Sequence, residues 1–207
     1  MRTITRRMAL SGALAVGASL ASTLAQASLA PALADHPGYS AWDKSHVGNA
    51  IPLSNLAETT GAARSLRDWI GPRPAVLALW ATWCGPCLME KPAQAHMNAR
   101  LLTAGARARI FALQAYDNVT LSSARRVLAR LNASELPNAR ASEEAEKAFV
   151  DVFGASPRAA DRVSMPSVLL LDADGRELGR AVGTMPGADG LTDYWDDDET
   201  FEFLRQL

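Results

Sequence analysis

The chain has 207 residues, of which 48% are hydrophobic and 21% are charged. This length is enough for one domain with a full hydrophobic core and too short for two domains of ordinary size. The formal net charge is −1, and lysine and arginine are not gathered into a stripe. The composition therefore argues against nucleic acid as a main partner.

Residues 1–34 have the order of features that is typical of an export signal. Three arginines are the only charged residues before Asp35, and a long run of Ala, Leu, Ser and Gly follows them. We expect cleavage after Ala34, and the pair Arg6–Arg7 favours the twin-arginine route to the periplasm over an ordinary Sec signal. The alternative is an uncleaved signal that anchors the chain, since the uncharged run is long enough to span a bilayer.

The next segment, residues 35–74, is expected to be an N-terminal extension of loose structure. One short strand is predicted near Ile51–Leu56 and one turn of helix near Ser65–Ile70. The remaining residues, 75–207, are expected to form the main domain.

The main domain begins with alternating strands and helices. The apolar run "AVLALWA" at 75–81 predicts a buried central strand. Apolar residues then recur at helical spacing from Pro86 to about Leu102, and Pro92 should kink that helix. Residues 108–115 predict a second buried strand, and residues 120–132 predict an amphipathic helix.

The C-terminal half adds an extra helix, a hairpin and a closing helix. Residues 142–154 predict the extra helix, which lies within an insert at 133–162 and is capped by Ser142. Residues 167–183 predict a β-hairpin that would add antiparallel edge strands, and the final "DDDETFEFLRQL" predicts the closing helix. Strands that alternate with helices imply a parallel core.

The only two cysteines, Cys84 and Cys87, lie in "WATWCGPCLMEKP" at the first strand-to-helix junction. A disulfide across two residues closes a very small loop and adds little stability, so we expect the pair to be kept for its reactivity. A CxxC beside a strand–helix–strand pattern predicts a thioredoxin-like α/β fold, with a central mixed sheet flanked by helices and the extra helical insert.

The position of the cysteines assigns their roles. At the start of a helix, unpaired backbone N–H groups and the helix dipole stabilise a thiolate. Cys84 is therefore expected to attack, and Cys87, one turn further on, to resolve the mixed disulfide. Half a zinc site is the alternative, but the three histidines show no ligand spacing. We expect no metal and no cofactor beyond the Cys84–Cys87 disulfide.

The CxxC segment resembles the active site of the TlpA/ResA/CcmG group of exported thioredoxin-like proteins. Members share W-A-x-W-C-x-P-C followed by Glu and Pro, which here are Glu90 and Pro92. The segment "SMPSVLLLDADGRELGRAVG" is similar to the group's proline loop, strand and turn. The resemblance implies that Pro166, after Met165, is a cis-proline facing the disulfide, and that the backbone at Met165 pairs with an extended substrate segment.

The resemblance also assigns a role to Glu90. Thioredoxin carries a buried Asp where this chain has Ala78, so Glu90 becomes the candidate for relaying the proton of Cys87. The alternative is that Glu90 is a solvated carboxylate on the helix surface. Trp83 is expected at the surface beside the disulfide and Trp80 in the core.

The expected substrate-binding surface combines five residues of the two motifs: Trp83, Gly85, Pro86, Met165 and Pro166. The Gly-Pro pair between the cysteines is the one found in reducing thioredoxins, which favours an exported thiol:disulfide reductase. The resemblance implies protein disulfide substrates such as haem-attachment cysteines of apocytochromes, copper-centre assembly proteins or a sulfur-oxidation carrier, and a membrane thiol-electron donor. The alternatives are a disulfide-forming oxidase and a Cu(I)-binding chaperone that uses the same cysteines.

Overall fold

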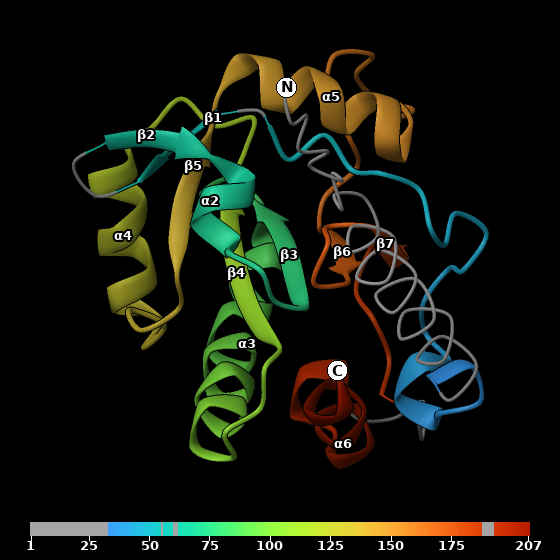
Figure 1. Ribbon diagram of the computed structural model, residues 1–207. Helices are drawn as coiled ribbons and strands as arrows, with labels where there is room; N and C mark the ends of the chain where they lie inside the picture. Colours follow the sequence, from blue (N-terminus) through green and yellow to red (C-terminus); the bar gives the residue numbers. More distant parts are fainter. Residues whose placement is uncertain (1–32, 55, 60–61, 188–192) are drawn as a thin grey trace, which may run out of the picture. The chain divides into compact units, whose positions relative to one another are not determined.

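The computed structural model describes residues 33–54, 56–59, 62–187 and 193–207 (Figure 1). The predicted export signal falls almost entirely outside this part of the chain. Among the described residues, no helix has both the length and the apolar character needed to cross a membrane. Residues 36–207 fold as one unit.

The centre of this unit is a mixed sheet with the strand order β2-β1-β5-β4-β3-β6-β7. The central strand β3 (Ala75–Trp80) runs parallel to β4 (Arg109–Gln114) and antiparallel to β6 (Ser167–Leu171). β4 in turn runs parallel to β5 (Asn138–Ala141). The two buried apolar runs of the sequence are thus neighbouring parallel strands, and the predicted thioredoxin-like α/β fold is confirmed.

The strand β5 corrects the prediction for the insert at 133–162, where only a helix was expected. Its sequence, "NARA", lacks the β-branched and aromatic residues that mark strands. It is extended because both of its edges are paired, with β4 on one side and with β1 (Leu56–Thr59) on the other. Tertiary pairing here overrides a weak local preference.

The N-terminal extension also differs from the prediction. The strand expected near Ile51–Leu56 lies further along the chain, as β1, which pairs with β2 (Ala62–Ser65). Ile51 and Leu53 are instead buried in the core. Residues of the extension therefore belong to the same sheet as the rest of the unit.

The predicted hairpin is present, but only one of its strands is an edge strand. β6 lies between β3 and β7 (Glu177–Val182), and β7 forms the edge. An inner antiparallel strand beside β3 places the start of β6, and Pro166 just before it, in the middle of the sheet.

The predicted helices are present, with small differences at their ends. The side chains of Thr120, Ser142 and Asp197 accept a backbone N–H at the starts of three of them, which accounts for where these helices begin. The first long helix runs through Pro92 without a break. The helices are α2 (Leu66–Ile70), α3 (Gly85–Thr103), α4 (Leu121–Arg130), α5 (Glu143–Phe153) and α6 (Asp198–Gln206), with the 3-10 turns η1 (Pro37–Tyr39) and η2 (Tyr194–Asp196).

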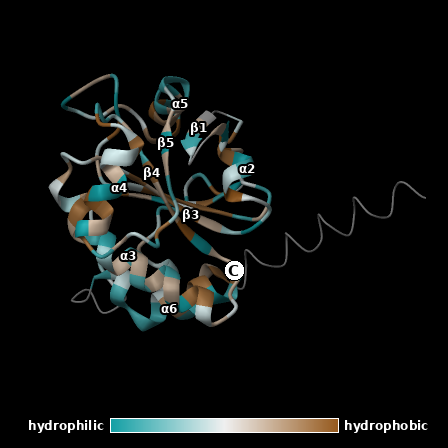
Figure 2. Ribbon diagram, turned by 90° about the vertical axis from the view of Figure 1, so that its left-hand side faces the viewer, coloured by the Kyte–Doolittle hydropathy of each residue, from teal (hydrophilic) through white to brown (hydrophobic). Residues whose placement is uncertain are grey.

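Helices cover both faces of the sheet. Successive side chains of a strand point to opposite faces, and Leu77 and Phe111 join Phe149 of α5 and Ile70 of α2 in one core. Helices α3 and α6 lie side by side (Figures 1 and 2). The hydrophobic residues of the central strands are enclosed between the helices (Figure 2).

A buried ion pair fastens the edge strand β7 to its surroundings. The Nη2 and Nε atoms of Arg180 each lie 2.5 Å from a carboxylate oxygen of Glu177, whose side chain is fully buried. Arg180 also donates to the carbonyl oxygen of Val152 in α5. Its backbone exchanges two hydrogen bonds with Asp43. The pair thus joins β7, α5 and the N-terminal segment, and that segment covers the sheet edge.

We expect Arg180→Leu to lower the free energy of unfolding by about 3–5 kcal/mol, because it leaves the Glu177 carboxylate buried and unpaired. Urea unfolding measures this loss. The matched control is Arg205→Leu, which breaks the exposed pair with Glu202 and should change stability little. Similar losses in the two variants would contradict a special role for the buried pair.

Candidate active site

Cys84 and Cys87 form a disulfide at the start of α3. Cys84 is the N-cap residue of the helix, and its Sγ accepts the backbone N–H of Cys87 at 3.3 Å. Pro86 fits the first turn because its missing N–H would have no intrahelical partner. Cys84 is 3% exposed and Cys87 is 0% exposed, so a partner molecule reaches Cys84 first.

The two tryptophans of the motif lie where the sequence predicts. Trp80, on β3, is fully buried, and its indole N–H donates to Oδ1 of Asn138. Trp83 is 53% exposed, and Gly85 and Pro86 beside it are also exposed. These residues therefore form a surface next to the disulfide, while their contact with a substrate stays a prediction.

The Met165–Pro166 peptide bond is cis, which is the geometry that the resemblance implies. Met165 lines a cavity of about 700 Å³ together with Trp83. The structure thus brings the proline loop and the residue before Cys84 to one hollow of the surface. Pairing of the Met165 backbone with a substrate strand stays a prediction.

Glu90 is not the solvated carboxylate of the alternative interpretation, because it is only 4% exposed. It lies one helical turn after Cys87, on the same side of α3. Burial raises the pKa of Glu90 to about 7, and the nearby Lys91 ammonium partly opposes this rise. A carboxyl with a pKa near neutrality can take up or release a proton at working pH.

Lys91 is a buried residue that the sequence analysis missed. Its Nζ donates to Oε1 of Gln94 at 2.7 Å, and Nε2 of Gln94 donates to Oε2 of Glu90 at 3.2 Å. Nζ also lies 5.8 Å from the centroid of the Trp80 ring, which favours its charged form. Burial nonetheless lowers the pKa of Lys91 to about 7. Its spacing of four residues from Cys87 was the available signal, because that spacing puts both on one helix face.

The buried acid of this site comes from the helix rather than from the central strand. Ala78 of β3 is buried and lies between Ala112 of β4 and Val168 of β6 in the sheet. A carboxylate is therefore absent at the position where thioredoxin has one. Glu90 on α3 is the carboxyl of the active-site motif that is buried.

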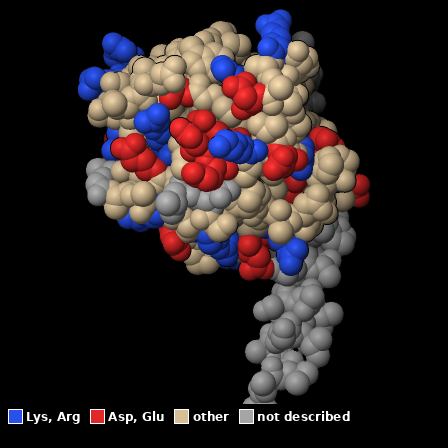
Figure 3. Space-filling model, turned by 90° about the horizontal axis from the view of Figure 1, so that it is seen from above, with Lys and Arg blue, Asp and Glu red and all other residues tan. Residues whose placement is uncertain are grey.

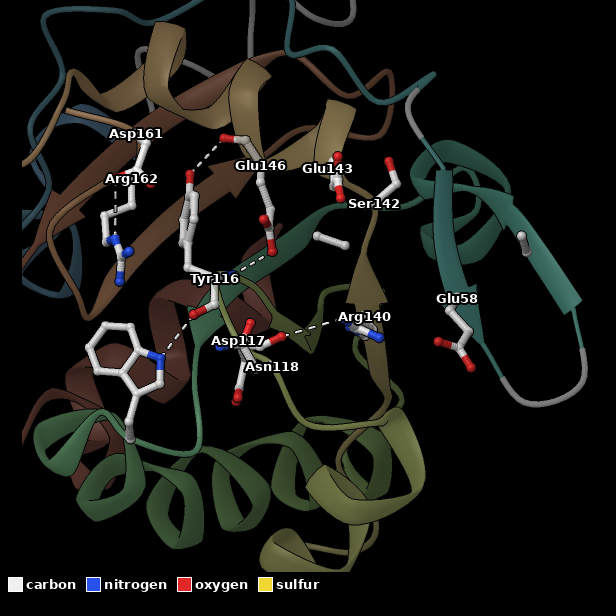
Figure 4. Close-up of a pocket in the computed structure, with 13 residues that line it drawn as sticks. Glu58, Tyr116, Asp117, Asn118, Arg140, Ser142, Glu143, Glu146, Asp161 and Arg162 are labelled. Atoms are coloured by element: carbon white, nitrogen blue, oxygen red, sulfur yellow. Dashed lines mark hydrogen bonds and ion pairs between the residues drawn. The ribbon is translucent and has the colours of Figure 1, made fainter. Parts of the chain in front are cut away.

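Trp83 is held in place by residues that follow β4. Its indole N–H donates to the carbonyl oxygen of Tyr116 at 2.9 Å (Figure 4). Tyr116 has a φ of 55°, a left-handed conformation that costs energy in a residue other than glycine. Glu146 of α5 holds it there, since its carboxylate accepts the N–H of Tyr116 and its carbonyl oxygen accepts the phenol O–H. Next along the chain, Asp117 accepts the N–H of Thr82 at 2.6 Å.

The sequence analysis missed Tyr116, Asp117 and Glu146. The carboxyl ends of parallel strands meet at one edge of a sheet, so residues just after the second strand must lie near Cys84. That rule could have found Tyr116 and Asp117. Glu146 could not be found this way, because its approach depends on how α5 packs.

The described residues contain no group of three or more His, Cys, Asp or Glu side chains arranged to hold a metal ion. A model of the Redoxin family matches residues 46–194, which is well over half of the chain. The chain belongs to the Redoxin family. With its cysteine pair at the start of α3, this Redoxin protein is a thioredoxin-like oxidoreductase. A comparison with curated proteins finds no match.

Solved structures share the fold of this Redoxin protein. The thioredoxin domain of a thiol-disulfide oxidoreductase from Bacteroides vulgatus superimposes with a TM-score of 0.53 at 13% identity, covering 75% of this chain and 93% of the other. A thiol:disulfide interchange protein of the thioredoxin family from Chlorobium tepidum gives a TM-score of 0.53 at 18% identity, with coverages of 75% and 97%. A thiol:disulfide interchange protein from Bacteroides sp. gives 0.51 at 15%, with coverages of 65% and 80%.

We expect Lys91→Met to raise the pKa of Glu90 above about 7, because the variant loses the ammonium that favours the ionised carboxyl. The carboxyl ¹³C shift of Glu90, followed against pH, measures this change. The folded-state pKa lies above the unfolded value of 4.5. Folding therefore binds a proton between these two values, and the free energy of unfolding falls as pH rises through that window.

The fall in stability should extend to higher pH in Lys91→Met than in the parent. The control is the double variant Lys91→Met/Glu90→Gln, which has no carboxyl at this position and should lack the fall. An unchanged Glu90 titration in Lys91→Met would show that the two groups are not coupled.

Proposed function

We propose that this protein is an exported reductase of protein disulfides that works through the Cys84–Cys87 dithiol. The observation that supports the direction most is the surroundings of Cys84. In the described part of the structure its Sγ accepts one hydrogen bond, from the N–H of Cys87 at the start of α3. One donor and a helix dipole stabilise a thiolate moderately, whereas a strong oxidant requires a strongly stabilised thiolate in its reduced form.

The reaction proceeds through a mixed disulfide. In the reduced protein the Cys84 thiolate attacks one sulfur of a substrate disulfide, that S–S bond breaks, and the departing substrate thiolate takes up a proton. Cys87 then loses its proton and attacks Sγ of Cys84, which releases the second substrate thiolate. Two electrons pass to the substrate, and the Cys84–Cys87 disulfide forms.

Glu90 is the group that accepts the proton of Cys87 in the second step. It lies one turn from Cys87 on α3, and its pKa of about 7 suits it to both uptake and release. Lys91, bridged to Glu90 through Gln94, keeps the carboxyl from becoming permanently protonated. When the electron donor reduces the Cys84–Cys87 disulfide again, Glu90 returns a proton to Cys87.

The substrates are proteins that carry disulfides, of the kinds that the family resemblance implies: apocytochrome haem-attachment cysteines, copper-centre assembly proteins or a sulfur-oxidation carrier. Because an oxidising compartment does not keep this dithiol reduced, a membrane protein that delivers electrons through thiols completes the cycle.

Export to the periplasm, by the twin-arginine route, rests on the sequence of residues 1–34. Expression in a host with a periplasm should yield protein whose mass corresponds to a chain that begins at Asp35. A full-length protein in the membrane fraction would favour the uncleaved anchor instead.

We expect the Cys84–Cys87 couple to have a reduction potential near roughly −270 mV, the value of thioredoxin. Equilibration with dithiothreitol or glutathione mixtures measures this potential. The thiols are alkylated, and mass spectrometry gives the fraction of reduced protein. Cys84→Ser is the control and should show no two-electron titration. A potential near about −120 mV would overturn the reductase assignment in favour of an oxidase.

A further inference from the structure

Trp83 stands between two cavities of the surface. On one side lies the cavity of about 700 Å³ that Met165 lines, and on the other lies a cavity of about 730 Å³ that reaches α5 and β1 (Figure 4). Trp83 and Arg162 line both. The two cavities therefore adjoin at these two residues. We call them together the Trp83 groove, which extends from Met165 past the residue next to Cys84 to α5.

The two ends of the Trp83 groove differ in charge. At the Met165 end the charged lining residues are Arg158 and Arg162. At the α5 end two arginines, Arg140 and Arg162, are outnumbered by carboxylates. These carboxylates are Glu58, Asp117, Glu143, Glu146 and Asp161.

Several of these charged groups already have partners. Arg162 pairs with Asp161 at 3.4 Å, and Arg140 donates to the carbonyl oxygen of Asp117. The carboxylate of Asp117 accepts hydrogen bonds from Thr82, and that of Glu146 accepts one from Tyr116. Local contacts thus occupy Arg140, Arg162 and the inner carboxylates.

Two carboxylates of the α5 end are left for a ligand. Glu58 on β1 and Glu143 in the first turn of α5 are exposed, and no hydrogen bond or ion pair joins either side chain to another described residue. They come from different walls of the cavity (Figure 4). Figure 3 shows the side of the molecule on which α5 lies, where Asp and Glu side chains near the middle of the face have Lys or Arg side chains beside them.

We propose that the Trp83 groove binds the stretch of substrate polypeptide around its reactive cysteine, and that its α5 end takes a lysine or arginine side chain of that stretch. The proposal rests on the proposed function. An extended segment that crosses Trp83 brings its cysteine to Cys84, the next residue. A cationic side chain beside the cysteine then meets Glu58 and Glu143, neither of which forms an ion pair with a described lysine or arginine.

The redox step assigns no function to the insert at 133–162, and the proposal assigns it substrate binding. The insert supplies β5, α5 and the loop with Arg158 and Arg162, and so it forms most of both cavities. Through Glu146 and Tyr116 it also fixes the indole of Trp83. Residues of the insert thereby determine substrate preference next to the dithiol, while the dithiol itself is unchanged.

Capture of peptide thiols tests the proposal. The protein carries Cys87→Ala, and Cys84 is first converted to its mixed disulfide with thionitrobenzoate. The cysteine thiolate of a peptide attacks Sγ of Cys84, a Cys84–peptide disulfide forms, and thionitrobenzoate leaves with the electron pair and is followed by its absorbance. Three peptides differ only in having a lysine before the cysteine, a lysine after it, or glutamine at both places.

The variant is Glu58→Gln/Glu143→Gln, and the matched control is Glu144→Gln, which removes a carboxylate from the same turn of α5 outside the groove. We expect one lysine peptide to react about threefold or more faster than the glutamine peptide with the parent and the control, as exposed charge pairs allow. The variant should lose this ratio, and added salt should reduce it in the parent. The intrinsic reactivity of each peptide is the same with every protein. Comparing the lysine-to-glutamine rate ratio between the parent, the control and the variant therefore removes it.

Equal rates for lysine and glutamine peptides with the parent, or a ratio that persists in the variant, would overturn the proposal and leave the proposed function standing. Failure of every peptide, the glutamine peptide included, to displace thionitrobenzoate would overturn the proposed function and the groove assignment with it.

Discussion

The rigid placement of β3 is the constraint on which the rest of the site depends. All six of its residues are buried, and it is hydrogen-bonded to β4 on one side and β6 on the other. A strand held in this way cannot shift along its axis without exposing its side chains or breaking both ladders. Its carboxyl end therefore fixes where α3 begins, and Cys84 sits at that beginning as the helix cap. The reactive sulfur thus lies at the helix N-terminus, where backbone N–H groups stabilise a thiolate.

Two buried charge pairs have different roles in this fold. Glu177 and Arg180 contact each other directly at the sheet edge, and this contact secures β7, α5 and the N-terminal segment. Glu90 and Lys91 influence each other electrostatically and are bridged through Gln94 rather than hydrogen-bonded directly, and burial brings both pKa values close to neutrality. A directly paired buried charge holds structure, whereas a loosely paired one is able to exchange protons. The second arrangement lies one turn from Cys87.

The strained conformation of Tyr116 marks the place where the insert meets the redox site. A left-handed residue other than glycine persists only where its surroundings hold it, and here two hydrogen bonds that Tyr116 donates to Glu146 do so. The same residue presents its carbonyl oxygen to Trp83. The insert thereby reaches the surface beside Cys84 through a short chain of contacts. A helix that only covered a sheet edge would not require such strain.

The sequence predicts the thioredoxin-like fold, the reactive pair Cys84–Cys87 and most helices, because apolar spacing and capping residues act locally. It did not determine β5, whose "NARA" becomes a strand only between two partners. The spacing of Glu90 and Lys91 from Cys87 places them on the same face of α3, but only tertiary packing decides that this face turns inward and buries both charged side chains. Only the packing of α5 against the carboxyl edge of the sheet brought Glu146 to Tyr116 and shaped the Trp83 groove. Such contacts join residues far apart in the chain, and local sequence patterns do not encode them.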